Sequence, residues 1–129
     1  MKFVVCALLF LLTLYPQTSD VSKSLGVATI AEAQSRQARA NRRLARALDL
    51  AKKGQYQAAS MELFDMSRSI VFRDRRMQIR YVLGLMLYEM KLYQTAAFQF
   101  SEVVRDGKSK YVTQSLEKLA LLSAESLDS

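Results

Sequence analysis

Few residues in this chain of 129 could do acid–base or nucleophilic chemistry. The chain has no His, which is the side chain that most often acts as a general base near neutral pH and as a zinc ligand. Its one Cys, Cys6, lies in an N-terminal apolar run and can form neither an internal disulfide nor a zinc cluster. The sequence therefore predicts a protein that is not an enzyme and that uses no metal or cofactor.

Two carboxylates, Glu62 and Asp65, are three residues apart and would share one face of a helix. A glycosidase needs two carboxyl groups that face each other across a cleft, a few ångströms apart. Because one exposed helix face does not provide that geometry, we expect both to be surface residues.

Arginine gives the sequence its strongest potential for ligand binding, because a guanidinium group binds phosphate or carboxylate through two parallel hydrogen bonds. The net charge of +7 arises in the first half, since residues 34–80 carry twelve Lys or Arg against four Asp or Glu, whereas residues 81–129 carry five against six. The predicted basic surface consists of Arg36, Arg39, Arg43, Arg46, Arg73, Arg75, Arg76 and Arg80.

Three roles for this basic half compete. The first is a solvated helix face that keeps the protein soluble, which is the usual role of such a run. The second is contact with an acidic protein partner or an anionic surface. The third is nucleic acid binding, which is disfavoured because no aromatic residue is interleaved with the arginines of the first helix face.

The N-terminus has the pattern of a secretory signal. Lys2 is followed by an apolar run from Phe3 to Tyr15, which Pro16 ends. The run is shorter than the roughly 20 apolar residues of a membrane-spanning helix. We expect residues 1–33 to form a signal peptide, cleaved after Ala33, and the mature chain to be periplasmic or secreted. The alternative is an uncleaved N-terminal anchor, and a membrane is expected as a partner only through such an anchor.

Composition and periodicity predict an all-α fold. Four Gly and one Pro are too few for the tight turns of a many-stranded β fold. Apolar residues recur at helical spacing in five segments, at residues 36–53, 56–72, 75–90, 93–105 and 109–126. The short connectors between the first two and between the third and fourth segments make their neighbours antiparallel.

The same periodicity predicts which face of each helix is buried. The positions for the first two helices are Leu44, Ala47, Leu48 and Ala51, then Ala59, Leu63, Met66 and Ile70. The positions for the other three are Met77, Tyr81, Gly84, Leu85 and Tyr88, then Ala96, Phe100 and Val103, then Val112, Leu116, Leu119, Leu122 and Ala124.

The chain contains an internal repeat with an offset of 37 residues. The segment Gly54-Gln55-Tyr56-Gln57-Ala58-Ala59 returns in looser form as Lys91-Leu92-Tyr93-Gln94-Thr95-Ala96. Large and small apolar residues also match on both sides of this turn, as Leu48 does with Leu85. Such matches indicate a repeated helix pair, in which Gly54 is suited to end the first helix in a left-handed cap.

This pattern resembles the tetratricopeptide repeat, a two-helix module of about 34 residues. The family has a Gly, an aromatic residue and an Ala at the turn, which Gly54, Tyr56 and Ala59 reproduce, and a Leu-Gly pair that Leu83 and Gly84 reproduce. Arg46 stands where the first copy would have that Leu, so the resemblance is to a divergent array. The alternative is an unrelated helical bundle.

The resemblance implies a short solenoid that binds other proteins. Its first repeat would span residues 40–73, its second 77–110, and residues 111–126 would be a capping helix or the first helix of a third repeat. The groove of the family would here be lined by Asn41, Leu44, Leu48, Gln78, Tyr81, Leu85 and Tyr88. The implied function is a non-catalytic scaffold in a bacterial envelope or outside the cell, with a protein or peptide partner that could be acidic. The alternative is a basic helical protein that binds an anionic surface or nucleic acid.

Overall fold

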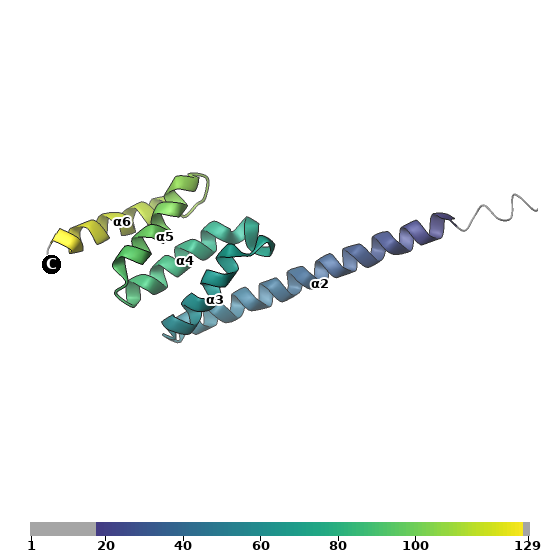
Figure 1. Ribbon diagram of the computed structural model, residues 1–129, viewed down its shortest axis with the longest axis horizontal. Coiled ribbons are helices and arrows are strands. Elements are labelled where there is room, and N and C mark those ends of the chain that lie inside the picture. The colour runs from purple at the N-terminus through teal and green to yellow at the C-terminus, as the bar shows by residue number, and fades with distance from the viewer. Residues whose placement is uncertain (1–17, 128–129) are drawn as a thin grey trace, which may run out of the picture. The chain divides into compact units, whose positions relative to one another are not determined.

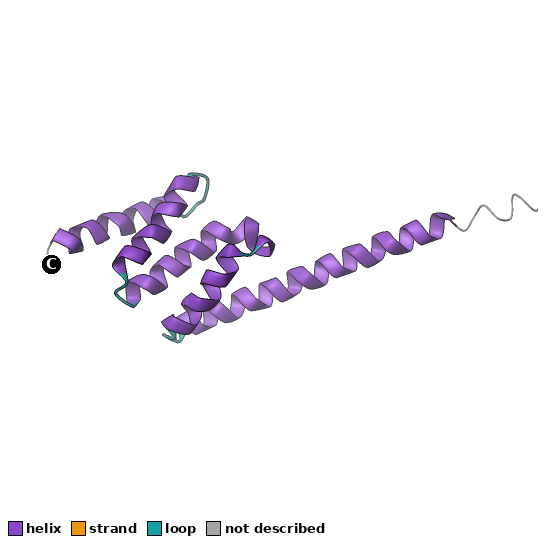
Figure 2. Cartoon of the chain, in the orientation of Figure 1, coloured by secondary structure: helices purple, strands orange, loops and turns teal. Residues whose placement is uncertain are grey.

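The computed structural model describes the backbone of residues 18–127 and the side chains from residue 26 onward. The described chain is helical throughout its regular elements, with no strand (Figure 2). This confirms the predicted all-α class. The elements, labelled in Figure 1, are α2 (Thr18–Lys52), α3 (Tyr56–Arg68), the 3₁₀ segment η1 (Ile70–Arg75), α4 (Arg76–Glu89), α5 (Tyr93–Asp106) and α6 (Val112–Leu127).

The predicted apolar run of the signal lies outside the described residues. Within the described part of the chain, no helix has the length and apolar character needed to cross a membrane.

The chain divides into two compact units, residues 1–38 and 39–129. The described part of the first unit is the N-terminal part of α2, whose side chains at 26–37 are all exposed. The prediction that this helix begins at residue 36 is wrong, because α2 already includes Thr18. Residues 18–35 lack Pro and include three Ala, so they form helix without the apolar stripe on which the prediction relied.

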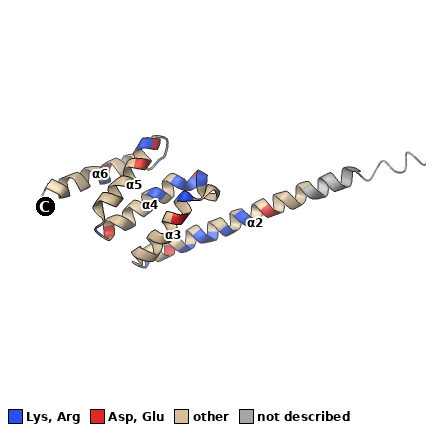
Figure 3. Cartoon of the chain, viewed as in Figure 1, with Lys and Arg blue, Asp and Glu red and all other residues tan. Residues whose placement is uncertain are grey.

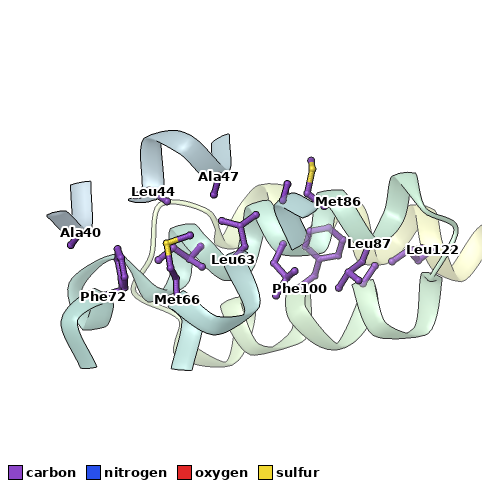
Figure 4. Close-up of a cluster of buried hydrophobic side chains, with 14 residues drawn as sticks. Ala40, Leu44, Ala47, Leu63, Met66, Phe72, Met86, Leu87, Phe100 and Leu122 are labelled. Atoms are coloured by element: carbon purple, nitrogen blue, oxygen red, sulfur yellow. The ribbon is translucent and has the colours of Figure 1, made fainter. Parts of the chain in front are cut away.

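In the second unit, successive helices pack against each other: α3 against α4, α4 against α5, and α5 against α6. A continuous core runs through them and includes Ala40, Leu44 and Ala47 from the last part of α2 (Figure 4). The fully buried side chains of α3 and α5 are Ala59, Leu63 and Met66, and Ala96, Phe100 and Val103, as the periodicity predicts.

Three of the predicted core positions are exposed. Ile70 is 70% exposed because α3 ends at Arg68 and the extended backbone of Ser69 directs the chain into η1. The prediction of one helix over 56–72 is therefore wrong at its end. Leu116 and Ala124 are exposed on α6, where only Ser115 and Leu122 are buried.

Helix α4 fully buries only one of its five predicted core positions, Gly84. Its buried residues are Ile79, Leu83, Gly84, Met86 and Leu87, whereas Met77, Tyr81, Leu85 and Tyr88 are half-buried. The helix is apolar around most of its circumference and contacts both α3 and α5, so more than one face is covered.

Candidate functional site

The turn after α2 and the turn after α4 have the same backbone geometry. After α2, the N–H of Gly54 donates to the carbonyl of Ala51 at 3.1 Å, and the N–H of Gln55 donates to that of Leu50 at 3.0 Å. These two bonds define a Schellman motif, in which Gly54 adopts a left-handed φ of 74°. The predicted left-handed cap at Gly54 is confirmed.

After α4 the same motif forms without a glycine. The N–H of Lys91 donates to the carbonyl of Tyr88 at 2.9 Å, and the N–H of Leu92 donates to that of Leu87 at 2.9 Å. Lys91 has a φ of 60°, a left-handed conformation that L-residues rarely adopt. The turn geometry therefore returns after 37 residues even where the residue type does not favour it.

An arginine links the two helices on each side of these turns. Arg43 on α2 donates from Nε to Glu62 Oε2 on α3 at 2.9 Å, and its Nη2 lies 3.8 Å from Asp65 Oδ2. The carboxylates Glu62 and Asp65, which the sequence predicts to be surface residues, thus form an ion-pair cluster with Arg43.

Arg80 on α4 makes the equivalent contacts to α5. Its Nη1 donates to Gln99 Oε1 at 3.2 Å and lies 3.9 Å from Glu102 Oε2. Arg80, Gln99 and Glu102 follow Arg43, Glu62 and Asp65 by 37 residues each. A set of side-chain contacts between helices therefore recurs at the period of the sequence repeat.

Small residues at equivalent positions allow the helices to pack closely. Ala47 on α2 is fully buried, and its counterpart Gly84 on α4 packs against the ring of Phe100. A Cβ at Gly84 would lie 2.7 Å from Phe100 Cε1, closer than a carbon–carbon contact permits. The absence of a side chain at residue 84 is therefore a condition of the α4–α5 packing.

The predicted groove residues differ in how accessible they are. Asn41 is exposed, whereas Leu44 is buried and belongs to the core. The remaining members are half-buried and lie on α2 and α4: Leu48, Gln78, Tyr81, Leu85 and Tyr88.

Both tyrosines of this set, Tyr81 and Tyr88, contact α6 or the residue just before it. Tyr81 stacks on Tyr111, which precedes α6, with 5.1 Å between ring centroids. The Tyr88 hydroxyl donates to Glu125 Oε1 at 2.7 Å, and Lys118 Nζ lies 5.3 Å from the centroid of the Tyr88 ring. The two tyrosine rings thus connect α4 to α6, and these contacts reduce the ring surface that is available to a ligand.

These contacts also change how the tyrosines titrate. Burial raises the pKa of Tyr81, and the nearby Glu117 and Tyr111 raise it further. The hydrogen bond from its hydroxyl to Glu125 is the main cause that raises the pKa of Tyr88. Both phenols are therefore neutral hydrogen-bonding groups at physiological pH.

The predicted basic residues fall into separate groups (Figure 3). Arg36, Arg39 and Arg46 are exposed on α2, and Arg36 Nη2 lies 3.9 Å from Glu32 Oε2. Arg43 and Arg80 form the links between helices described above. Arg73, Arg75 and Arg76 lie together at η1 and the start of α4.

An open cleft of about 560 Å³ lies between this segment and the loop that joins α5 to α6. One wall contains Arg73, Arg75 and Arg76, and the other contains Lys108 and Lys110. We refer to it as the basic cleft. The two lysines were not among the residues predicted to form a basic site, although Lys110 follows Arg73 by 37 residues and the repeat pairs these positions.

Comparison with protein-family models, curated proteins and solved structures finds no match to this chain.

Proposed function

We propose that this chain is an exported, non-catalytic scaffold of the tetratricopeptide type, whose compact unit binds a protein or peptide. The observation that carries the proposal is the recurrence, after 37 residues, of both the Schellman turn and the arginine link between helices. Helix pairs that repeat in this way stack into solenoids, which present extended surfaces to partners.

In this assignment α2 from residue 39 and α4 are the first helices of two repeats, and α3 and α5 are their second helices. Helix α6 is the first helix of a third repeat or a cap. Tyr88 on α4 and Glu125 on α6 are themselves 37 residues apart and hydrogen-bonded at 2.7 Å, which supports the equivalence of these two helices.

The proposed binding surface is the part of the groove that remains accessible, which includes Asn41, Leu48, Gln78 and Leu85. These positions combine an exposed amide, Asn41, and a half-buried amide, Gln78, with half-buried apolar side chains. Such a surface suits a peptide that buries a few apolar side chains and pairs its backbone with amides. The absence of His from the whole chain supports a role in binding over catalysis.

Site-specific crosslinking tests the proposal. A photoreactive amino acid is placed at Leu48 or Leu85 of the full chain in its native cells, with exposed Gln57 on α3 as the matched control. We expect the same discrete protein adduct from Leu48 and Leu85 and none from Gln57. An adduct pattern shared by all three positions, or no adduct at Leu48 and Leu85, would contradict the proposal.

A further inference from the structure

The basic cleft concentrates positive charge at one end of the compact unit. It is lined by five cations and by two carboxylates, Asp74 and Asp106. Among the described residues, none of Arg73, Arg75, Arg76, Lys108 and Lys110 forms an ion pair. The cleft therefore has a net positive charge that the protein itself leaves uncompensated.

The beginning of α4 adds to this positive charge. Arg76, Met77 and Gln78 line the cleft and form the first turn of a helix of 14 residues. No side chain caps this helix end, and its first turn contains no acidic residue. The positive end of the helix dipole thus reinforces the five cations.

Two apolar side chains are exposed beside the cleft. Ile70 is 70% exposed and Val71 is 48% exposed, both in η1. Both residues precede the cleft residues Arg73 and Asp74 in the same short segment, which is kinked at Phe72, and neither apolar residue lines the cleft itself.

We propose that this end of the molecule binds the surface of an anionic phospholipid membrane. The cations of the basic cleft pair with headgroup phosphates, while Ile70 and Val71 insert at the boundary between headgroups and acyl chains. Burial of apolar side chains next to headgroup-paired cations is the combination that holds peripheral proteins at a membrane surface.

An acidic peptide would satisfy the cations but not the apolar pair. A peptide that lay in the cleft would leave Ile70 and Val71 in water, because they stand outside its lining. A membrane surface in contact with the cations can also cover these two side chains, because they lie only two and three residues before Arg73 in η1. The cations and apolar side chains that this proposal uses are not groove residues, although Gln78 borders both sites, so the proposal goes beyond the proposed scaffold function and can fail independently of it.

A single tryptophan tests the insertion directly, since the chain has no Trp of its own. Ile70→Trp in the full chain is mixed with vesicles of phosphatidylglycerol and phosphatidylcholine in equal parts, and with vesicles of phosphatidylcholine alone. We expect a blue shift of the emission and protection from acrylamide on the anionic vesicles. Leu121→Trp, at a site on α6 that is 51% exposed, is the matched control and should show neither change.

Charge variants then test the cleft. In the Ile70→Trp background, Arg73→Gln with Lys110→Gln should raise the lipid concentration at half-maximal shift about 30-fold, because each cation near an anionic surface contributes about fivefold. The control pair Arg42→Gln with Arg46→Gln removes the same charge from exposed positions on α2. It should change the lipid concentration at half-maximal shift far less. Circular dichroism confirms that each variant is folded.

Several results would overturn the proposal. One is the absence of an emission shift from Ile70→Trp on anionic vesicles, and another is an equal emission shift from Leu121→Trp. A third is an equal loss of vesicle binding in both charge variants. A shift produced by a poly-glutamate peptide and not by vesicles would also overturn it, and would make the cleft a peptide site.

Discussion

Arg80 donates a hydrogen bond to Gln99 across the α4–α5 interface, with 3.2 Å between Nη1 and Oε1. Thirty-seven residues earlier, Arg43 donates to Glu62 across the α2–α3 interface at 2.9 Å. Two arginines that look like members of a solvated face in the sequence thus connect the two helices of each pair. The basic character of the first half has in part a structural role.

Replacement of Arg80 by Ala should destabilise the fold more than replacement of Arg43. The Arg80 side chain is 20% exposed and Glu102 is 21% exposed, so the change leaves the buried amide of Gln99 without its donor and, among the described residues, leaves Glu102 paired with Arg105 alone. We expect a loss of about 1 to 3 kcal/mol of unfolding free energy. Arg43 is 43% exposed, and Arg43→Ala should cost less than about 1 kcal/mol.

Urea unfolding followed by circular dichroism measures both changes. Arg46→Ala, at an exposed position without an ion pair in the described structure, is the control. Equal effects at residues 43, 46 and 80 would show that the link between α4 and α5 adds nothing to stability.

Removing the glycine from one Schellman turn and introducing a glycine into the other should have opposite effects on stability. Gly54→Ala should lower the unfolding free energy by about 1 kcal/mol, because an L-residue is strained at a φ of 74° even though the space around a Cβ is open. Lys91→Gly should raise it by about 1 kcal/mol, because it relieves the same strain at a φ of 60°. Thermal unfolding compares the two variants with the wild type, and a Lys91→Gly protein that is less stable would contradict the equivalence of the turns.

The sequence predicts those parts of the fold that depend on local periodicity. All five helical segments are found, and the buried faces of α3 and α5 follow from the spacing of Ala59, Leu63 and Met66 and of their counterparts. Gly54 is recognisable because glycine favours the left-handed cap. Lys91 could be placed only through the repeat, since its residue type gives no sign of a positive φ.

Other features depend on tertiary contacts and could not be predicted locally. The covered faces of α4 result from its position between α3 and α5 and not from a single apolar stripe. Lys108 and Lys110 are about 35 residues from Arg73 and Arg75, and only the tertiary packing of α4 against α5 brings them to the same cleft.

Overpacking tests whether Ala59 and Ala96 mark equivalent helix crossings. Both are fully buried, so Ala59→Phe and Ala96→Phe should each lower the unfolding free energy by about 1 to 3 kcal/mol. Ala58→Phe, at the exposed neighbouring position, is the control and should be nearly neutral. A large loss from only one of the two buried sites, measured by thermal unfolding, would argue against equivalent crossings.

Stability should fall at alkaline pH as the tyrosines ionise. The folded-state pKa values of Tyr81 and Tyr88 are raised, so the folded state holds these protons more tightly than the unfolded chain. Their contribution is complete below the unfolded-state pKa of about 10 and is lost as pH rises through the higher folded-state values.

The midpoint of thermal unfolding, measured between neutral pH and the onset of chemical damage, tests this prediction. Tyr88→Phe removes the hydroxyl that donates to Glu125 and should make the decline shallower. A decline that is identical in wild type and variant would show that Tyr88 does not contribute to it.

The repeat itself is tested most directly by a solution structure of the full chain from nuclear magnetic resonance. We predict that residues 39–72 superpose on residues 76–109, that Lys91 has a positive φ like Gly54, and that contacts from Arg43 to Glu62 and from Arg80 to Gln99 are both observed. An extended or helical Lys91, together with different crossings of α2 on α3 and of α4 on α5, would contradict the repeat and the scaffold function proposed from it.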